Sequence, residues 1–168
     1  MSASESGLAR RPLTVTRLGV DDAGEVLTLQ RAAYVTEAAA HRDFDLPPLT
    51  QRLEELCAEL KHPDVVALGI RVDGRLLGAV RLRRVDAGEA VELGRLTVVP
   101  DCQGMRIGTQ LLRSAEAEFD GASEMRLFTG ERSLANIRLY ERNGYVETER
   151  TPAGDYHLVH LVKVLNRG

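Results

Sequence analysis

Residues 93–112 read LGRLTVVPDCQGMRIGTQLL, and the order of residue types in this stretch decides how the surrounding chain folds. A run rich in β-branched residues ends in Val-Val-Pro, and the apolar spacing of a helix begins at Ile107. Gly104 and Gly108 stand at this junction with Arg106 between them. A strand that turns directly into a helix brings backbone N–H groups and the positive end of the helix dipole to one point. The stretch therefore predicts a place where an anion such as phosphate can bind.

Two side chains at the same junction support anion binding. Gln103 can donate a hydrogen bond from its amide, and Thr109 places a hydroxyl in the first helical turn. The stretch lacks the Gly-Lys-Ser/Thr ending of a P-loop and the GxGxxG pattern of dinucleotide-binding folds. Spacing alone leaves two interpretations open, a phosphate-binding turn and a plain strand-to-helix connection.

The composition indicates one globular domain. The chain has 168 residues, of which 43% are hydrophobic, and this fits a single domain with a core of its own. We expect residues 1–11 to form a loose, disordered tail and residues 12–168 to form this domain.

The charge and the cysteines exclude several classes of protein. With 22 basic and 25 acidic residues the net charge is -3, so no overall field favours nucleic acid or an anionic membrane surface. No apolar run approaches the roughly 18 residues of a membrane helix. Cys57 and Cys102 are too few for a disulfide framework, and neither has a ligand partner at zinc spacing. We therefore expect a cytoplasmic protein with no metal ion, no nucleic-acid partner and no membrane association.

The first part of the chain predicts a strand followed by two helices. Residues 12–18 alternate like a strand, and a helical pattern follows to about residue 40. Pro47 and Pro48 break that pattern, so we expect a loop there and a second helix over residues 50–60. Helical spacing places four residues on the buried face of this second helix: Leu53, Leu56, Cys57 and Leu60.

The middle of the chain predicts antiparallel strands. Asp73-Gly74 separates two strand-like runs, residues 65–72 and 75–85, and such a link is a strong hairpin signal. A looser turn at residues 86–89 leads into a third strand over residues 90–99.

The last part of the chain alternates between helices and strands. Asn143-Gly144 is a typical helix stop, and the turn-rich segment TPAGD separates the last two strands. The predicted elements are a helix over residues 107–119, a strand over 125–129, a helix over 133–142, and strands over 145–148 and 156–164. Together the elements predict an α/β fold, an α+β mixed sheet with helices on both faces.

Two motifs resemble those of one known family. The stretch VVPDCQGMRIGTQLL is similar to the acetyl-coenzyme A signature of the GNAT N-acetyltransferase superfamily, Gln/Arg-x-x-Gly-x-Gly/Ala after a strand that ends in Val-x-Pro. Pro100, Gln103 and Gly108 occupy the matching positions. The later segment SLANIRLYERNGYVE resembles a second motif of the family, in which Asn136 precedes a Leu-Tyr pair ending at Tyr140. Two motifs at the family's separation are more specific than either motif alone.

The order of the predicted elements is similar to the GNAT fold over nearly the whole chain from Pro12. The resemblance implies a central, mostly antiparallel sheet with helices on both faces and a parallel, splayed pair of strands at the cofactor site. It also implies that the cofactor is acetyl-coenzyme A.

The resemblance further implies how the cofactor is held. Backbone groups of the strand from Leu96 to Val98 pair with the pantetheine arm, Asn136 hydrogen-bonds the same arm, and the glycine turn binds the pyrophosphate. The cofactor-binding residues implied in this way are Leu96, Thr97, Val98, Gln103, Gly104, Met105, Arg106, Ile107, Gly108, Thr109, Asn136 and Tyr140.

Arg106 departs from the pattern, because the family usually has its first motif glycine at this position. The side chain either points outward or folds over the pyrophosphate as an added cation, and a third interpretation is a degraded cofactor site. An arginine held at positive φ would destabilise the fold by about 1 kcal/mol or more. We therefore interpret the family glycine as serving close approach of the ligand, and we expect ordinary dihedral angles at Arg106.

Acetyl transfer from a thioester to an amine needs a neutral amine, a polarised carbonyl and a proton for the departing thiolate. It requires no covalent enzyme intermediate. The resemblance implies that Tyr140 protonates the sulfur, although a tyrosine on an amphipathic helix can also be a core residue. Glu92 is the predicted base, acting directly or through water, and the alternative is a solvated carboxylate on a strand.

The resemblance implies that the loop after the first helix and the closing hairpin shape the acceptor pocket, here about residues 34–49 and 151–156. The acidic side chains in these segments suit a cationic amine such as a polyamine, an aminoglycoside or a lysine side chain, and the alternative is a solvated acidic surface. The predicted acceptor-binding residues are Tyr34, Glu37, Asp43 and Asp155.

The sequence thus predicts an N-acetyltransferase that moves the acetyl group of acetyl-coenzyme A to a primary amine by direct attack in a ternary complex. The acceptor is a small molecule or a protein, and the chain is a monomer or a homodimer. A second hypothesis is a non-catalytic domain that binds or senses acyl-coenzyme A. The presence of both Asn136 and Tyr140 favours the enzyme.

Overall fold

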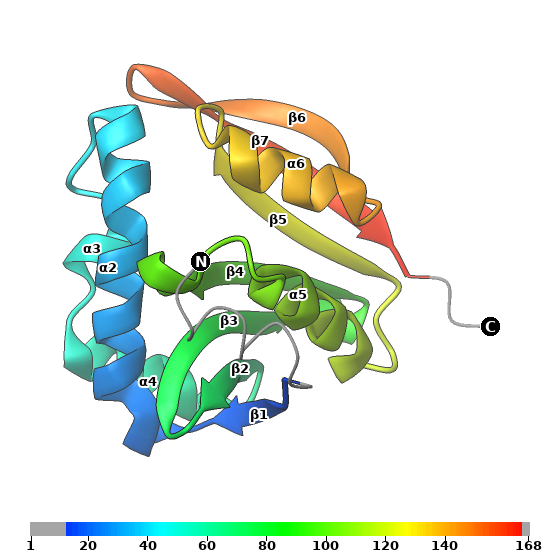
Figure 1. The fold of residues 1–168 in the computed structure, drawn as a ribbon. Coiled ribbons are helices and arrows are strands. Elements are labelled where there is room, and N and C mark those ends of the chain that lie inside the picture. The colour runs from blue at the N-terminus through cyan, green and yellow to red at the C-terminus, as the bar shows by residue number, and fades with distance from the viewer. Residues whose placement is uncertain (1–12, 166–168) are drawn as a thin grey trace.

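The computed structural model describes residues 13–165, which form a seven-stranded sheet with helices on both faces (Figure 1). The strand order is β1-β2-β3-β4-β5-β7-β6, and every neighbouring pair is antiparallel except β4 and β5. The strands are β1 Val15–Leu18, β2 Val65–Val72, β3 Arg75–Val85, β4 Ala90–Val98, β5 Glu124–Gly130, β6 Val146–Ala153 and β7 Tyr156–Val164. The predicted mixed, mostly antiparallel sheet is confirmed.

The helices lie in two groups on opposite faces of the sheet (Figure 1). Arg81 of β3 bonds to Gln30 and Glu59 on one face, while Gly78 of the same strand lies against Ile107 on the other. The first group is α2 Ala23–His41, α3 Pro47–Thr50 and α4 Leu53–Lys61, and the second is α5 Ile107–Glu118 and α6 Leu134–Arg142.

The parallel strands β4 and β5 pair over only a short part of their length. Ala90–Glu92 pair with Glu124–Arg126. Beyond these residues β4 continues to Val98 and β5 to Gly130, but the two strands no longer pair with each other. The two strands therefore separate toward their C-terminal ends, as the splayed pair implied by the resemblance requires (Figure 1).

The hairpin between β2 and β3 forms at the predicted link. Asp73 has a φ of 51° and Gly74 a φ of 83°, and two positive φ values in a row match the twist of the flanking strands. Val72 pairs with Arg75 directly across this turn, so the hairpin prediction is confirmed.

The region predicted as a loop around Pro47 and Pro48 contains the short helix α3, so that prediction is wrong. Both prolines stand in the first turn of the helix, where a missing N–H and a fixed φ do no harm. The next helix, α4, begins at Leu53 rather than at residue 50, and Leu53 is 44% exposed instead of buried. Cys57 is partly buried against the core.

The segment TPAGD was predicted to be a turn, but its first residues extend β6. Ala153 pairs with Tyr156, and the turn consists of Gly154, with a φ of 66°, and Asp155. β6 is the last strand of the sheet, and an edge strand tolerates Pro152 because one of its sides needs no hydrogen-bond donors.

The core lies between the sheet and both helix layers, and Leu56, Ile70, Leu111 and Leu161 are fully buried in it. Within residues 13–165, none of the helices is both long and apolar enough to cross a membrane. The predicted tail and the predicted start of the domain at Pro12 lie outside the described residues.

Candidate functional site

A cavity of about 790 Å³ lies where β4 and β5 separate. Its lining includes residues 93–98 at the end of β4 and residues 128–130 at the end of β5. The junction before α5 lines it from one face of the sheet, and α2 lines it from the other. The cavity therefore reaches through the sheet, and two molecules can meet in it from opposite faces.

The junction before α5 presents backbone donors to the cavity. The chain leaves β4 through a 3₁₀ turn and continues through Gly104, which has a φ of 83°, to the helix start at Ile107. The first N–H groups of a helix have no partner inside the helix, and Ile107, Gly108 and Thr109 lie in the cavity lining. This arrangement can bind the oxygens of a phosphate group.

Arg106 adopts a backbone conformation that differs from our expectation. As the residue that precedes α5 it has a φ of 64° and a ψ of 14°, which is the left-handed region. The prediction of ordinary dihedral angles was wrong, because this position favours glycine for its backbone and not only for close approach. The Arg106 side chain is exposed at the cavity, so its contact with a bound pyrophosphate stays a prediction.

A bulge bends β4 beside the cavity. Arg81 of β3 pairs with Gly94, while Ala79 pairs with Thr97, so β4 carries one extra residue in this register. Arg95 in the bulge has a φ of 53°. Because residues 93–98 have no partner on β5, polar backbone groups on that edge of β4 can bind a ligand.

Tyr140 lies in the cavity lining on α6. The residue is only 6% exposed, and its ring packs edge-on against Tyr145 with 5.8 Å between the centroids. Burial raises the pKa of the Tyr140 phenol far above its ordinary value, and Tyr34 and Glu37 raise this pKa further. The phenol is therefore protonated at neutral pH and can donate a proton into the cavity.

Glu37 connects α2 to the start of α6. Its carboxylate accepts hydrogen bonds from the Ser133 hydroxyl and, at 3.2 Å, from the Asn136 amide. Asn136 thus has a partner within the protein in addition to its place in the cavity lining. Burial raises the pKa of the Glu37 carboxyl.

His41, at the end of α2, is 4% exposed and uses both ring nitrogens. Its Nδ1 lies 2.9 Å from the carbonyl oxygen of Glu37, and its Nε2 accepts a hydrogen bond of 3.1 Å from the backbone N–H of Arg132. These partners fit the neutral ring with its proton on Nδ1. A Cβ at Gly130 would overlap this ring, so the glycine allows α2 to approach β5.

Arg95 and Tyr34 meet at the α2 side of the cavity. Burial raises the pKa of the Tyr34 hydroxyl, while the charge and hydrogen bonding of Arg95 oppose this rise. The Nε atom of Arg95 is buried and has no hydrogen-bond partner among the described residues. Arg95 also contributes, after burial, to lowering the pKa of the neighbouring Arg81.

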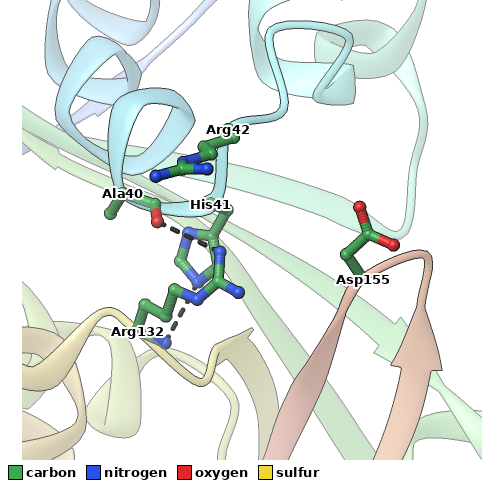
Figure 2. Close-up of a pocket in the computed structure, with 5 residues that line it drawn as sticks. All are labelled: Ala40, His41, Arg42, Arg132 and Asp155. Carbon is green, nitrogen blue, oxygen red and sulfur yellow. Dashed lines mark hydrogen bonds between the residues drawn. The ribbon is translucent and has the colours of Figure 1, made fainter.

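A smaller hollow of about 450 Å³ opens beside the cavity at the end of α2. Figure 2 shows His41, Arg42 and Arg132 on one side of this hollow and Asp155 opposite them at the β6–β7 turn. Arg132 donates to the carbonyl oxygen of Ala40 at 3.3 Å. The hollow thus holds charges of both signs rather than an acidic surface alone.

Most of the predicted site residues lie together at the cavity, and three do not. Glu92 is exposed and lies one residue before the lining begins, Met105 packs against the core, and Asp155 belongs to the smaller hollow. The predicted residues in the cavity lining are Tyr34, Glu37, Asp43, Leu96, Thr97, Val98, Gln103, Gly104, Arg106, Ile107, Gly108, Thr109, Asn136 and Tyr140.

Several lining residues were missed by the sequence analysis. Arg95 is a charged residue inside the otherwise apolar run LGRLTVV, and this contrast was a usable signal. His41, Phe128 and Thr129 reach the cavity only through tertiary packing, and nothing in their local sequence marks them.

Comparisons with known proteins agree with this geometry. A model of the acetyltransferase (GNAT) family matches residues 28–145, which is more than half of the chain. An IAA acetyltransferase of Azospirillum brasilense is 32% identical over 99 residues, which cover 58% of this chain and 63% of that protein. The chain thus spans less than two thirds of the length of this relative.

Solved structures share the fold. The PaiA N-acetyltransferase of Thermoplasma acidophilum, in complex with coenzyme A, has a TM-score of 0.75 at 20% identity, over 89% of this chain and 98% of that one. YncA of Salmonella typhimurium, with its cofactor acetyl-CoA, has a TM-score of 0.75 at 18% identity, over 94% of this chain and 96% of that one.

Proposed function

Because the chain belongs to the acetyltransferase (GNAT) family, we propose that it transfers the acetyl group of acetyl-coenzyme A directly to a primary amine. The observation that carries this proposal is the cavity that reaches through the sheet between β4 and β5. A cofactor held at the α5 side and an amine held at the α2 side can meet there without a covalent enzyme intermediate.

The residues at the cavity fit acetyl-coenzyme A. The N–H groups at the start of α5 suit the pyrophosphate, and the unpaired edge of β4 from Leu96 to Val98 suits the amides of the pantetheine arm. A Cβ at Gly108 would make ordinary van der Waals contact with Leu139 at 3.5 Å, so packing within the protein does not itself require a glycine at this position. When bound, acetyl-coenzyme A supplies the activated thioester.

Tyr140 provides the proton for the departing thiolate. Its phenol carries a proton at neutral pH, as a tyrosine ordinarily does, and the side chain lies in the cavity lining. A positioned acid lowers the barrier by donating its proton as the carbon–sulfur bond breaks.

Glu37 is the better placed base. It lies in the cavity lining on the α2 side, and burial raises its pKa toward the range that suits a base at neutral pH. Hydrogen bonds from Ser133 and Asn136 hold its carboxylate in place. Glu92 lies outside the lining, so a role for it requires a connecting water.

Release of free thiol from acetyl-coenzyme A, measured against a panel of primary amines, tests the proposed function. We expect release above the rate without enzyme for at least one amine, with formation of an equal amount of acetylated amine. A parallel thermal melt with acetyl-coenzyme A measures binding, because a ligand of the native state raises the melting temperature.

The two readouts together separate the proposed enzyme from a binding domain. A raised melting temperature without thiol release for any amine would favour a non-catalytic acyl-coenzyme A domain. No change in either readout would exclude acetyl-coenzyme A as a ligand.

A further inference from the structure

Arg95 is a partly buried cation in the cavity lining that has no counter-ion among the described residues. Its Nε atom is buried and makes no hydrogen bond within the described part of the chain. A buried donor without a partner is unfavourable in the protein alone, and a ligand that accepts a hydrogen bond relieves this cost.

The other arginines between residues 13 and 165 that are at least partly buried each bind a carboxylate, so Arg95 is unusual in this protein. The shortest nitrogen–oxygen distances of these pairs are 2.5 Å for Arg71–Glu25, 2.9 Å for Arg81–Glu59 and 2.6 Å for Arg126–Glu124. Since the other partly buried arginines each bind a carboxylate of the protein, a carboxylate of a ligand would complete the same kind of pair at Arg95.

Arg95 acts on the α2 side of the sheet. It interacts with Tyr34 of α2 and with Arg81, whose guanidinium donates to Gln30 of α2 at 2.8 Å. The α5 junction, where the pyrophosphate is proposed to bind, lies on the opposite face. Arg95 thus lies on the side of the cavity that the proposed function gives to the acceptor.

The acidic residues of the cavity lining are bound by the protein itself. Glu37 accepts from Ser133 and Asn136, and Asp43 accepts from the Tyr156 hydroxyl at 2.8 Å. Neither carboxylate is therefore a free anion that would select an acceptor for its positive charge, whereas an anionic group of the acceptor would meet an arginine without a counter-ion.

We propose that the acceptor is an amine that also carries a carboxylate, as an amino acid does, and that Arg95 and the Tyr34 hydroxyl bind this carboxylate. The inference rests on the proposed function, because it names the acceptor class for the same cavity. A planar guanidinium binds a carboxylate through two parallel hydrogen bonds, which fixes the orientation of the ligand. Glu37 on the same face then receives the proton that the ammonium group must lose.

Matched acceptors test this proposal. For each common amino acid, thiol release is measured with the free acid, with its primary amide and with the decarboxylated amine. We expect kcat/KM for at least one free acid to exceed that of its amide and its amine by about 10- to 100-fold.

Arg95→Gln tests the role of the guanidinium. It should lower kcat/KM for the free acid to the level of the amide, while kcat/KM for the amide changes little. Arg95→Lys should give a kcat/KM for the free acid between those of the wild type and Arg95→Gln, because lysine keeps the positive charge but lacks the two parallel N–H donors of the guanidinium. The rise in melting temperature with coenzyme A should be unchanged in both variants, which shows that they are folded. Tyr34→Phe should reduce the preference for the acid by a smaller factor.

Binding measurements keep this test independent of turnover. In protein saturated with coenzyme A, the free acid should raise the melting temperature more than its amide, and Arg95→Gln should abolish this difference. Equal or better use of decarboxylated amines, or a preference that Arg95→Gln leaves intact, would overturn the proposal. If no amine releases thiol, the proposed function fails, and the binding measurement alone decides on the carboxylate site.

Discussion

At the scale of single residues, Tyr140 has the two properties that a proton donor to a thiolate needs. It lines the cavity, and its phenol carries a proton at neutral pH, because the pKa of a tyrosine is ordinarily near 10 and burial raises it further. Tyr140→Phe retains the ring and nearly all of its packing, so the fold and the affinity for acetyl-coenzyme A should change little. We expect kcat to fall by about 10²-fold, because the lost interaction acts mainly in the transition state.

Tyr145→Phe is the matched control for this prediction. It removes a second buried phenol, which donates to Glu116 at 3.2 Å and lies outside the cavity lining. Its kcat should equal that of the wild type. If Tyr140→Phe also keeps the wild-type kcat, Tyr140 is a packing residue, and if the variant loses affinity for acetyl-coenzyme A, Tyr140 serves binding.

A second residue-scale prediction separates the two carboxylates considered as base. Glu37→Gln should lower kcat by about 10²-fold and remove the acidic limb of the dependence of kcat on pH. In the wild type this limb should lie above pH 4.5, the ordinary value for glutamate, because burial raises the pKa of Glu37. Glu92→Gln should leave the limb in place, and the reverse pattern in the two variants would assign the base to Glu92.

The site residues that belong to a sequence motif could be predicted, whereas those brought to the cavity by tertiary structure could not. Asn136 and Tyr140 were found because the spacing of the second motif is local. The charge of Arg95 within an apolar run was a local signal, but the bulge that contains this residue arises from the register between β3 and β4, which no single segment encodes. Glu37 was expected to contact the acceptor, but its bonds to Ser133 and Asn136 join residues that are far apart in the chain.

At the scale of elements, the junction before α5 depends on one strained residue. Arg106→Gly and Arg106→Ala both remove the guanidinium, but only glycine relieves the left-handed backbone. We expect the glycine variant to have a free energy of unfolding about 1 kcal/mol higher than that of the alanine variant. Chemical denaturation of the two variants measures this difference, and equal stabilities would show that the backbone at this position is unstrained.

A second prediction at this scale concerns the first turn of α5. The Cβ of Gly108→Val would fit beside Leu139 and Val98, but its methyl groups would enter the space proposed for the pyrophosphate. We expect the affinity for acetyl-coenzyme A to fall more than 10-fold while stability changes by less than about 1 kcal/mol. Gly108→Ala should give a smaller loss of affinity. Wild-type affinity in the valine variant would place the pyrophosphate elsewhere.

The elements that the sequence predicted well are those with local signals. Asp73-Gly74 identified the β2–β3 hairpin because few residue pairs adopt two positive φ values. The loop predicted at Pro47 and Pro48 is a short helix, because proline is compatible both with a loop and with a first helical turn. TPAGD was predicted to be a turn because it contains proline, which strands tolerate only at the edge of a sheet. The sequence does not show that β6 is an edge strand.

At the scale of the whole molecule, the fold places the two proposed binding surfaces on opposite faces of one sheet, and the cavity joins them where β4 and β5 separate. The mixed sheet was predicted from the order of the elements, whereas the separation of β4 and β5 was predicted only from the family resemblance. Nothing in the sequence of β4 or β5 alone shows where their pairing ends, because pairing depends on both strands at once.

In the proposed function both substrates occupy this cavity together and react directly. The most direct test is the initial rate of thiol release, measured over a grid of acetyl-coenzyme A and acceptor concentrations. We predict that release requires both substrates and that the double-reciprocal lines intersect, as a ternary complex requires. Parallel lines would exclude direct transfer in a ternary complex, because they indicate a covalent acetyl-enzyme, for which Cys102 in the lining would be the first candidate.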